Sequence, residues 1–149
     1  MNDEFFMNRA IALAKEAAEE GEVPVGAVVV FDGKIVGTGR NRREISKNAL
    51  AHAEIEAINE ACRTLGGWRL WQCDMYVTLE PCPMCTGAII NSRIKRLVYG
   101  ASDYKAGSCG SVVDLFSLPY NHKPEVVSGV MQEECAALLT DFFKRLRKK

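Results

Sequence analysis

The sequence predicts an α/β fold, in which helices pack on a mostly parallel β-sheet. Two observations predict it. Short apolar runs of strand length alternate with segments of helical periodicity along the 149 residues. No repeat, low-complexity run or linker interrupts this alternation, and the hydrophobic content of 48% is that of a globular protein. We therefore expect one domain over residues 1–149.

The N-terminal part predicts a helix followed by a hairpin. Apolar side chains recur at helical spacing over residues 3–20, and a glycine follows. The apolar run 23–31 predicts a buried strand. Asp32 and Gly33 form a turn dipeptide, so residues 34–39 are expected to return as an antiparallel strand.

The middle of the chain predicts a strand between two helices. A polar loop over 40–50 precedes a helix from 52 to about 65, which Gly-Gly ends. Residues 74–79 are expected to form a strand. The next helix is expected over 81–90, with prolines in its first turn, where a missing N–H is tolerated.

The C-terminal part repeats this alternation. A strand is expected over 96–101 and a glycine-rich loop after it, up to residue 111. The segment 112–116 predicts a short helix, 125–130 a last strand, and 132–149 a closing helix.

The charge distribution is uneven. The 19 basic and 19 acidic residues balance, yet five of the last six residues, "KRLRKK", are basic. One interpretation is a local contact with an anion such as nucleic acid; the other is a solvated helix end whose cations suit the helix dipole. The sequence shows no signal peptide and no apolar run of membrane-spanning length, so we expect a cytoplasmic protein without membrane contact.

Cys82 and Cys85 are the only cysteines with a motif-like spacing among the six. They lie three residues apart at an expected helix start, so both face one side of its first turn, where the dipole favours thiolates. Such a pair alone fits either redox chemistry or a metal. A four-coordinate metal needs further ligands, and His52 also opens a helix on an expected common sheet edge.

His52 and Glu54 raise a geometric question, since on a regular helix they would point about 200° apart. Both can still reach an object near the helix end, close to its axis, such as a metal between two helix N-termini. Two thiolates and a neutral imidazole balance the charge of Zn²⁺ and leave the fourth position open, which is the catalytic pattern. Taken alone, His52 is more often a surface or core residue, and Glu54 a dipole partner. The joint pattern H-x-E then P-C-x-x-C is that of zinc-dependent base deaminases.

Nearly the whole chain resembles the bacterial tRNA-specific adenosine deaminases. The segments that carry the resemblance are "EVPVGAVVV", "AHAEIEAI", "YVTLEPCPMCTGAII", "SRIKRLVYGASDYKAGSCGS", "NHKPEVVSGV" and "EECAALLTDFFKRLRKK". The resemblance implies a cytidine deaminase-like fold: a three-layer α/β/α sandwich with a five-stranded mixed sheet in the order 2-1-3-4-5. It also implies a homodimer with tRNA contacts from both subunits.

The resemblance assigns roles to individual residues. It implies that His52, Cys82 and Cys85 bind one Zn²⁺ per subunit and that Glu54 shuttles protons. Asn41 is implied to hydrogen-bond the target adenine. The other implied substrate-binding residues are Leu79 and Pro81 in the base pocket, Asp103 near the nucleotide backbone, Asn121 and His122 at neighbouring bases, and Phe142, Phe143, Lys144 and Arg145 on the closing helix.

The implied reaction is hydrolytic deamination of adenosine to inosine at the wobble position of a tRNA anticodon. Zinc-bound hydroxide would attack C6, and the family's usual substrate is the arginine tRNA with an ACG anticodon. An asparagine suits adenine because it offers a donor and an acceptor in one plane. Two alternatives stay open: a free-base deaminase of the same superfamily acting on guanine or cytosine, and a zinc-stabilised interaction module without catalysis. Glu54 argues against the second, since a structural site needs no shuttle.

Overall fold

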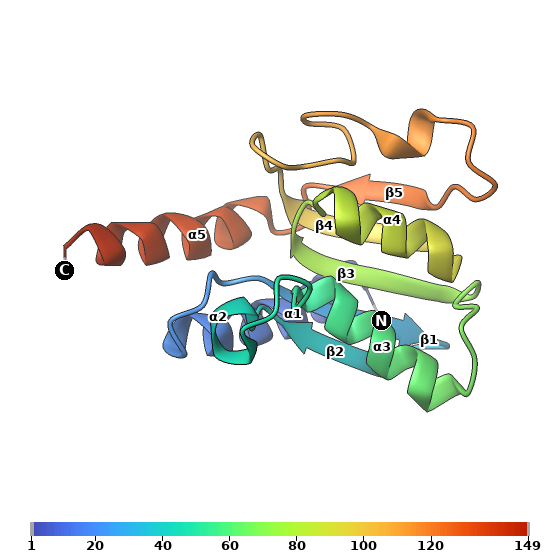
Figure 1. Ribbon diagram of the computed structural model, residues 1–149, viewed down its shortest axis with the longest axis horizontal. Coiled ribbons are helices and arrows are strands. Elements are labelled where there is room, and N and C mark those ends of the chain that lie inside the picture. Colours follow the sequence, from blue (N-terminus) through green and yellow to red (C-terminus); the bar gives the residue numbers. More distant parts are fainter. Residues whose placement is uncertain (1, 149) are drawn as a thin grey trace.

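The computed structural model describes residues 2–148 and consists of a five-stranded sheet between two layers of helices (Figure 1). The strands are β1 (Gly26–Phe31), β2 (Lys34–Arg40), β3 (Cys73–Leu79), β4 (Arg96–Ala101) and β5 (Glu125–Ser128). Their order in the sheet is β2-β1-β3-β4-β5, as the resemblance implied. β1 is antiparallel to both β2 and β3, whereas β3–β4 and β4–β5 are parallel. Four of the described strands thus run in the same direction, as expected for a mostly parallel sheet, and β1 is reversed because the β1–β2 hairpin inserts it antiparallel beside β3.

Each face of the sheet has its own apolar core. α1 (Asp3–Glu19) and α5 (Gln132–Arg147) cover one face, where Phe6, Met7 and Val28 are buried. α3 (Ala53–Leu65) and α4 (Pro83–Ser92) cover the other face, above Val29, Met75 and other buried strand residues. The alternation of strand side chains between these two cores explains why the central strands β1 and β3 read as continuous apolar runs.

α3 lies unusually close to β2 because both contact surfaces consist of small residues. Gly37 and Gly39 face it from the strand, and a side chain on Gly39 would collide with the backbone of Ala53 and Ala57 in α3. The buried alanines of α3 pack into the space that these glycines leave. This contact fixes the first turn of α3 at the carboxyl end of β2.

The parallel relation of β2, β3 and β4 brings three segments to one edge of the sheet. The chain leaves β2 at Arg40, β3 at Leu79 and β4 at Ala101, and all three exits lie at that edge. The helices α3 and α4 begin there. The expected meeting of two helix N-termini at one sheet edge is thus realised.

Several expected boundaries differ from the structure: the helix expected over 81–90 is α4 (Pro83–Ser92), and the strand expected over 125–130 ends at Ser128. The first strand begins at Gly26 rather than at residue 23, because the segment Glu22–Val25 passes along the site before it joins the sheet. The loop 40–50 contains a short helix, α2 (Arg43–Ser46), whose first backbone amides are capped by the distant Glu22. The short helix expected over 112–116 is a 3₁₀ turn, η1 (Leu115–Ser117), started by the Asp114 side chain. None of the helices in residues 2–148 is long and apolar enough to span a membrane.

Candidate active site

Three side chains that could bind a metal converge at this sheet edge. Nδ1 of His52 lies 3.6 Å from Sγ of Cys82 and 3.5 Å from Sγ of Cys85. The three ligand atoms all lie within 4.8 Å of one another. Cys85 is buried, and the other two are half-buried.

The donor set and its spacing fit a tetrahedral zinc ion. Zinc bonds of about 2.3 Å to sulfur and 2.0–2.1 Å to nitrogen, at a tetrahedral angle, separate the two atoms by about 3.5 Å. The separations in the structure, 3.5 and 3.6 Å, agree with this value. The cysteines face each other across one helix turn as free thiols, not as a disulfide. These residues could therefore hold a metal through three protein ligands.

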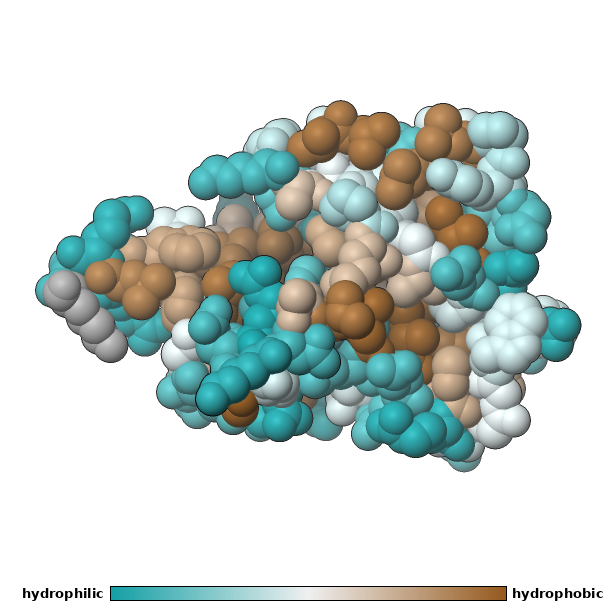
Figure 2. All heavy atoms as spheres, in the orientation of Figure 1, coloured by the Kyte–Doolittle hydropathy of each residue, from teal (hydrophilic) through white to brown (hydrophobic). Residues whose placement is uncertain are grey.

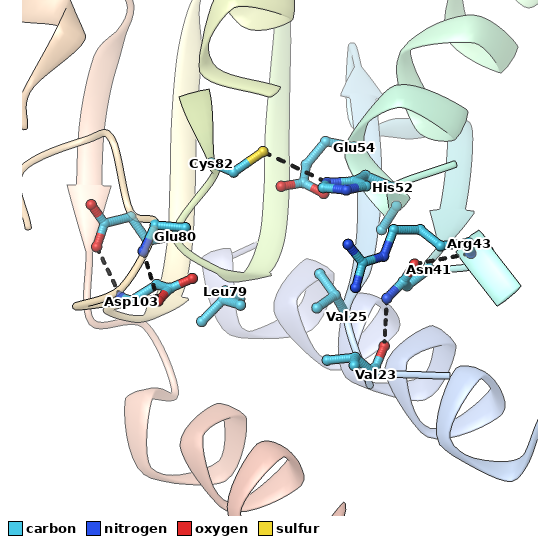
Figure 3. Close-up of a pocket in the computed structure, with 12 residues that line it drawn as sticks. Val23, Val25, Asn41, Arg43, His52, Glu54, Leu79, Glu80, Cys82 and Asp103 are labelled. Atoms are coloured by element: carbon cyan, nitrogen blue, oxygen red, sulfur yellow. Dashed lines mark hydrogen bonds between the residues drawn. The ribbon is translucent and has the colours of Figure 1, made fainter. Parts of the chain in front are cut away.

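The backbone of α3 explains how His52 and Glu54 approach the same point. His52 is the N-cap residue with an extended backbone (φ −83°, ψ 152°), so it is not part of the helical turn. Glu54 lies in the first turn and is 4% exposed. Figure 3 shows the carboxylate of Glu54 directed toward His52 and Cys82 from the helix end. The predicted end-on arrangement is realised because His52 precedes the helix.

The start of α4 favours a thiolate. Cys82 is the N-cap residue, and Pro83 occupies the first turn, as predicted. In the metal-free chain, hydrogen bonding from Cys85 and from His52 lowers the pKa of Cys82 to about 4. The pKa of Cys85 is raised, because its proton is the one donated to Cys82 and because the residue is buried. A bound cation favours the deprotonated form of both sulfurs.

The metal site opens into a cavity of about 240 Å³ (Figure 3). It is small relative to the sites of drug-sized ligands, which have volumes of about 300–1,000 Å³. Its polar side chains are those of Asn41, Arg43, His52, Glu54, Glu80, Cys82 and Asp103, and its apolar ones belong to Val23, Val25, Ala53, Leu79 and Ala106. The cavity therefore has the size and mixed lining of a site for one small molecule or for one part of a larger ligand.

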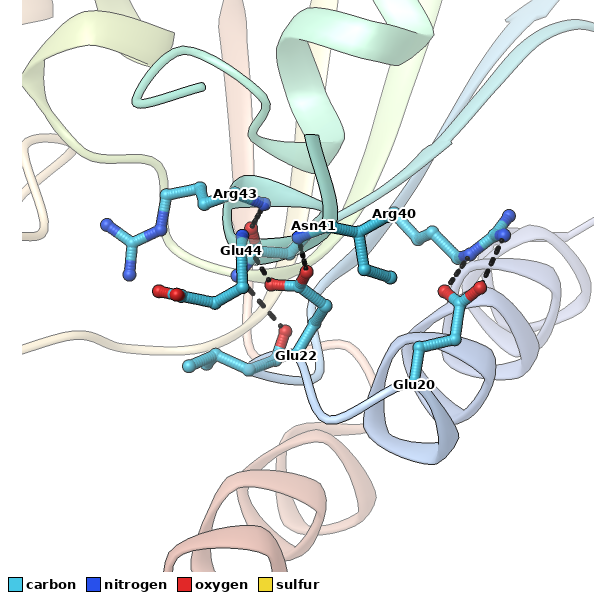
Figure 4. A network of polar contacts seen from close by, with 8 residues as sticks. Glu20, Glu22, Arg40, Asn41, Arg43 and Glu44 are labelled. Atoms are coloured by element: carbon cyan, nitrogen blue, oxygen red, sulfur yellow. Dashed lines mark hydrogen bonds and ion pairs between the residues drawn. The ribbon is translucent and has the colours of Figure 1, made fainter. Parts of the chain in front are cut away.

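Asn41 is buried in the cavity wall with its amide oriented by the backbone. Its Nδ2 donates to the carbonyl of Val23 at 3.3 Å (Figure 3), and its Oδ1 accepts from the amide of Arg43 at 3.3 Å (Figure 4). A primary amide has two N–H donors and two acceptor lone pairs. One N–H donor and one acceptor lone pair of Asn41 are therefore left for a ligand in the cavity.

Glu54 differs electrostatically from the other two carboxylates of the cavity. In the metal-free chain, burial raises the pKa of Glu54 to about 7. For Glu80, burial also favours the neutral form, but hydrogen bonds from Ser111 and from three backbone amides outweigh it and hold the pKa below its usual value. Asp103 uses Oδ1 to accept the amides of Lys105 and Ala106. Of the three cavity carboxylates, Glu80 and Asp103 thus accept backbone amides of residues 103–111, whereas Glu54 lies beside His52 and Cys82.

Glu80 is a site residue that the sequence analysis missed. Its carboxylate is 2% exposed and accepts hydrogen bonds from the amides of Asp103, Cys109 and Ser111 at 3.0–3.1 Å, and from the hydroxyl of Ser111. Gly107 packs against the same carboxylate. Glu80 therefore fixes the loop 102–111, which carries part of the cavity wall. Its only signal in the sequence is its place directly before the P-C-x-x-C motif.

The remaining predicted substrate residues lie outside the cavity. Pro81 is buried beside it without lining it, and its carbonyl accepts the amide of Ser108. His122 lies at the opposite edge of the sheet, where its Nε2 is 2.6 Å from the carbonyl oxygen of Ile94, and the exposed Asn121 precedes it. Phe143 is 42% exposed, and Lys144 and Arg145 line a surface hollow between α5 and α1. The roles predicted for these residues in RNA binding stay predictions.

Comparison with known proteins shows which family the chain resembles in sequence. The family described as MafB19-like deaminase matches residues 1–147. The tRNA-specific adenosine deaminase of Bacillus subtilis (strain 168) is 51% identical over 148 residues, which cover 99% of this chain and 92% of the relative.

Two solved structures show related folds. One, from work on A-to-I editing by tRNA:A34 deaminases at the wobble position, matches with a TM-score of 0.88 and 47% identity, covering 91% of this chain and 99% of that chain. A guanine deaminase from Bacillus subtilis matches less closely, with a TM-score of 0.68 and 35% identity, over 100% of this chain and 96% of that chain. Both the sequence and the fold are thus more similar to the tRNA-editing deaminases.

Proposed function

Since the chain belongs to the tRNA-specific adenosine deaminases, we propose that it hydrolyses adenosine to inosine at the wobble position of a tRNA anticodon. One observation in the structure supports this most directly. His52, Cys82 and Cys85, which could hold a metal, lie together at a small cavity, with Glu54 beside them and Asn41 in the wall.

We propose that the metal is zinc, one ion per subunit. The two thiolates and the imidazole match its ligand preference and its charge. When bound in such a site, zinc lowers the pKa of a coordinated water to about 7 and so supplies a nucleophile at neutral pH. Metal analysis of the purified protein should find about one zinc per chain. A value near zero, with Cys82 and Cys85 found as a disulfide, would contradict this assignment.

Glu54 is the residue that moves protons in the proposed reaction. Addition of water at C6 and loss of ammonia require one proton to pass from the water to N1 of the ring and a second to pass from the new C6 hydroxyl to the departing amine. The carboxylate of Glu54 lies beside the metal ligands, and it is not needed to complete the ligand set. The carboxylates of Glu80 and Asp103 accept hydrogen bonds from backbone amides of the loop 102–111 and so stabilise that loop.

Asn41 and the apolar wall orient the base. The free donor and acceptor of the Asn41 amide can pair with a purine edge in one plane. Val23, Val25 and Leu79 supply apolar contacts to the ring faces. Only an extruded base can enter such a cavity, and an anticodon loop provides unpaired bases at a low energetic cost.

We extend the proposal to the partners of the reaction. The substrate is an anticodon stem-loop, foremost that of the arginine tRNA with an ACG anticodon, and the site of action is the cytoplasm. The protein acts as a homodimer. Apolar side chains gather over the outer surface of α3 and α4 (Figure 2), where Ile55, Ile58 and Trp68 line a shallow hollow that a second subunit can cover. A second subunit could also bring Asn121 and His122 toward the RNA, since they lie far from their own cavity.

A direct test compares substrates. The wild-type protein is incubated with an ACG stem-loop, free adenosine, guanine and cytosine, and ammonia release is measured together with sequencing of the RNA. We expect adenosine at the wobble position to be read as guanosine, with little turnover of the free compounds. Preferred turnover of guanine or cytosine would instead favour the free-base alternative. Absence of ammonia from every substrate would favour the interaction module.

A further inference from the structure

The turn beside the cavity presents an aromatic ring that the proposed reaction does not use. Tyr104 directly follows the cavity residue Asp103, and it is 82% exposed. This is the largest exposed fraction among the exposed large apolar residues of the described chain. Isolated exposed apolar residues are common on protein surfaces. Exposure alone therefore assigns no role to Tyr104, whereas the turn that holds the ring and the residues around it indicate one.

The backbone around Tyr104 is held rigidly. The amide of Asp103 donates to Glu80 at 3.0 Å, and the Asp103 carboxylate accepts the amides of Lys105 at 3.0 Å and Ala106 at 3.3 Å. The carbonyl of Asp103 also accepts the amide of Gly107 at 2.9 Å. The ring is thus presented from an ordered turn, so that binding a partner requires little further ordering of the backbone.

The surface next to this turn suits a nucleic-acid strand. Lys105 lines a hollow of about 450 Å³ together with Phe143, Leu146 and Arg147 of α5. Two of these four side chains are cationic, two are apolar, and none is acidic. Proteins bind single-stranded nucleic acid with this combination, in which cations neutralise phosphates and aromatic rings stack on bases.

We propose that Tyr104 stacks on the base next to the deaminated adenosine, while the hollow of Lys105, Phe143, Leu146 and Arg147 holds the backbone of the same strand. This inference rests on the proposed action on tRNA. Extrusion of the target base removes a stacking partner from its neighbour. The ring of Tyr104, adjacent in sequence to a residue of the cavity wall, replaces that partner.

Substitutions of Tyr104 test the role of the ring. Affinity for the stem-loop is measured in Glu54→Ala protein, which does not turn the RNA over, and kcat and KM are measured in the active protein. Tyr104→Ala should weaken binding and raise KM by about 5- to 150-fold, the range that alanine substitution removes from base stacking. Tyr104→Phe should retain wild-type values, because stacking needs the ring and not the hydroxyl. Tyr104→Leu, which is apolar without a ring, should behave like Tyr104→Ala.

Trp71→Ala is the matched control. Trp71 is 60% exposed and lies before β3, at the sheet edge opposite the cavity, so its removal should leave affinity and KM unchanged. Zinc content and thermal stability should be the same in all variants. Equal affinity of wild type and Tyr104→Ala would overturn the proposal, as would a failure of Tyr104→Phe to retain binding.

Stem-loops with a single abasic nucleotide identify the stacked base. Removal of the base on one side of the target should weaken wild-type binding to the level of Tyr104→Ala and should not weaken Tyr104→Ala further. Independent, additive losses on both sides would show that Tyr104 does not stack on a neighbouring base. The proposed function fails separately, if the wild-type protein forms no inosine; the affinity measurements then still decide whether Tyr104 contacts RNA.

Discussion

At the scale of single residues, Glu54 separates metal binding from catalysis. We predict that Glu54→Ala keeps zinc and the fold but lowers the rate about 10²- to 10⁴-fold, the usual contribution of a positioned acid–base group. Glu56→Ala, two residues further along α3 and outside the cavity, is the control and should keep activity. Zinc content and single-turnover rates are the measurements. Loss of zinc in Glu54→Ala would identify Glu54 as a ligand.

Glu80 should act through the loop that it holds. We predict that Glu80→Gln lowers the stability by about 1–3 kcal/mol, because the amide NH₂ of glutamine faces backbone donors that then lose their acceptor. Loss of this anchor should also lower kcat/KM, since Asp103 and Ala106 line the cavity from the same loop. Urea unfolding and steady-state kinetics measure the two effects.

The exposed Glu125 allows the same substitution, glutamate to glutamine, to be made as a control. Glu125→Gln should change neither stability nor kcat/KM. If Glu80→Gln behaved in the same way, the loop would have to be held by contacts other than this carboxylate.

At the scale of elements, the contact of β2 with α3 sets the position of His52. We predict that Gly39→Ala destabilises the protein by about 1–3 kcal/mol, because its Cβ would overlap the α3 backbone at Ala53 and Ala57. Zinc affinity should fall as well, since Ala53 adjoins the ligand. Gly67→Ala, where a Cβ meets nothing, is the control. Thermal unfolding measures the stability, and a zinc competition assay measures the affinity. An unchanged Tm for Gly39→Ala would contradict the close approach of β2 and α3.

The end of α5 is predicted to bind RNA through charge. Deletion of residues 145–149, of which Lys149 lies outside the described chain, should raise KM for tRNA. It should also flatten the dependence of log Kd on log salt by about two phosphate contacts, each worth about 0.7–0.9. Two is the expected number because the exposed cations point in different directions: Arg145 and Lys148 line the hollow toward α1, and Arg147 lines the one beside Lys105.

The deletion should leave zinc content and kcat at saturating tRNA unchanged, since none of the removed residues that the structure describes, 145–148, lines the cavity. Lys34→Ala removes an exposed cation at the far sheet edge and serves as the control. Parallel salt dependences for the truncated and full-length proteins would show that the basic end is only a solvated helix terminus.

At the scale of the whole molecule, one ion pair joins the N-terminus to the sheet. Asp3 accepts two hydrogen bonds from Arg96, at 2.6 and 2.9 Å, and one from the hydroxyl of Tyr76 at 2.7 Å. The hydrogen bonds from Arg96 hold the pKa of Asp3 below its usual value. A carboxyl group whose pKa is lower in the folded state stabilises the fold fully at pH values above its unfolded pKa of about 3.9. This stabilisation disappears as the pH falls through the folded pKa.

We therefore predict that Asp3→Asn lowers the free energy of unfolding at pH 7 by about 1–2 kcal/mol, between the values of an exposed ion pair and a buried charged hydrogen bond. The difference from wild type should shrink below about pH 4. Glu4→Gln, exposed in the same helical turn, is the control. Urea titrations between pH 3 and 7 test this, and a difference independent of pH would exclude the ion pair as its cause.

The sequence predicted those parts of the molecule that depend on local pattern. The five strands, the main helices and the motif residues His52, Glu54, Cys82 and Cys85 follow from periodicity and spacing. Glu80 and Glu22 escaped prediction because their partners lie 22 to 31 residues away in the chain, where no local pattern signals a hydrogen bond. The antiparallel insertion of β1 beside β3 likewise depends on tertiary pairing, and only the family resemblance anticipated the strand order.

The projection of α5 beyond the sheet has a consequence for proteolysis (Figure 1). Lys144, Arg145 and Arg147 are exposed in its last turns, and helix ends open easily, so trypsin should cleave there before it reaches the rest of the chain. A tRNA that covers these cations should slow that first cut and leave the later ones unaffected. Limited digestion with and without RNA can thus map the bound face of the helix, even in protein that lacks catalytic activity.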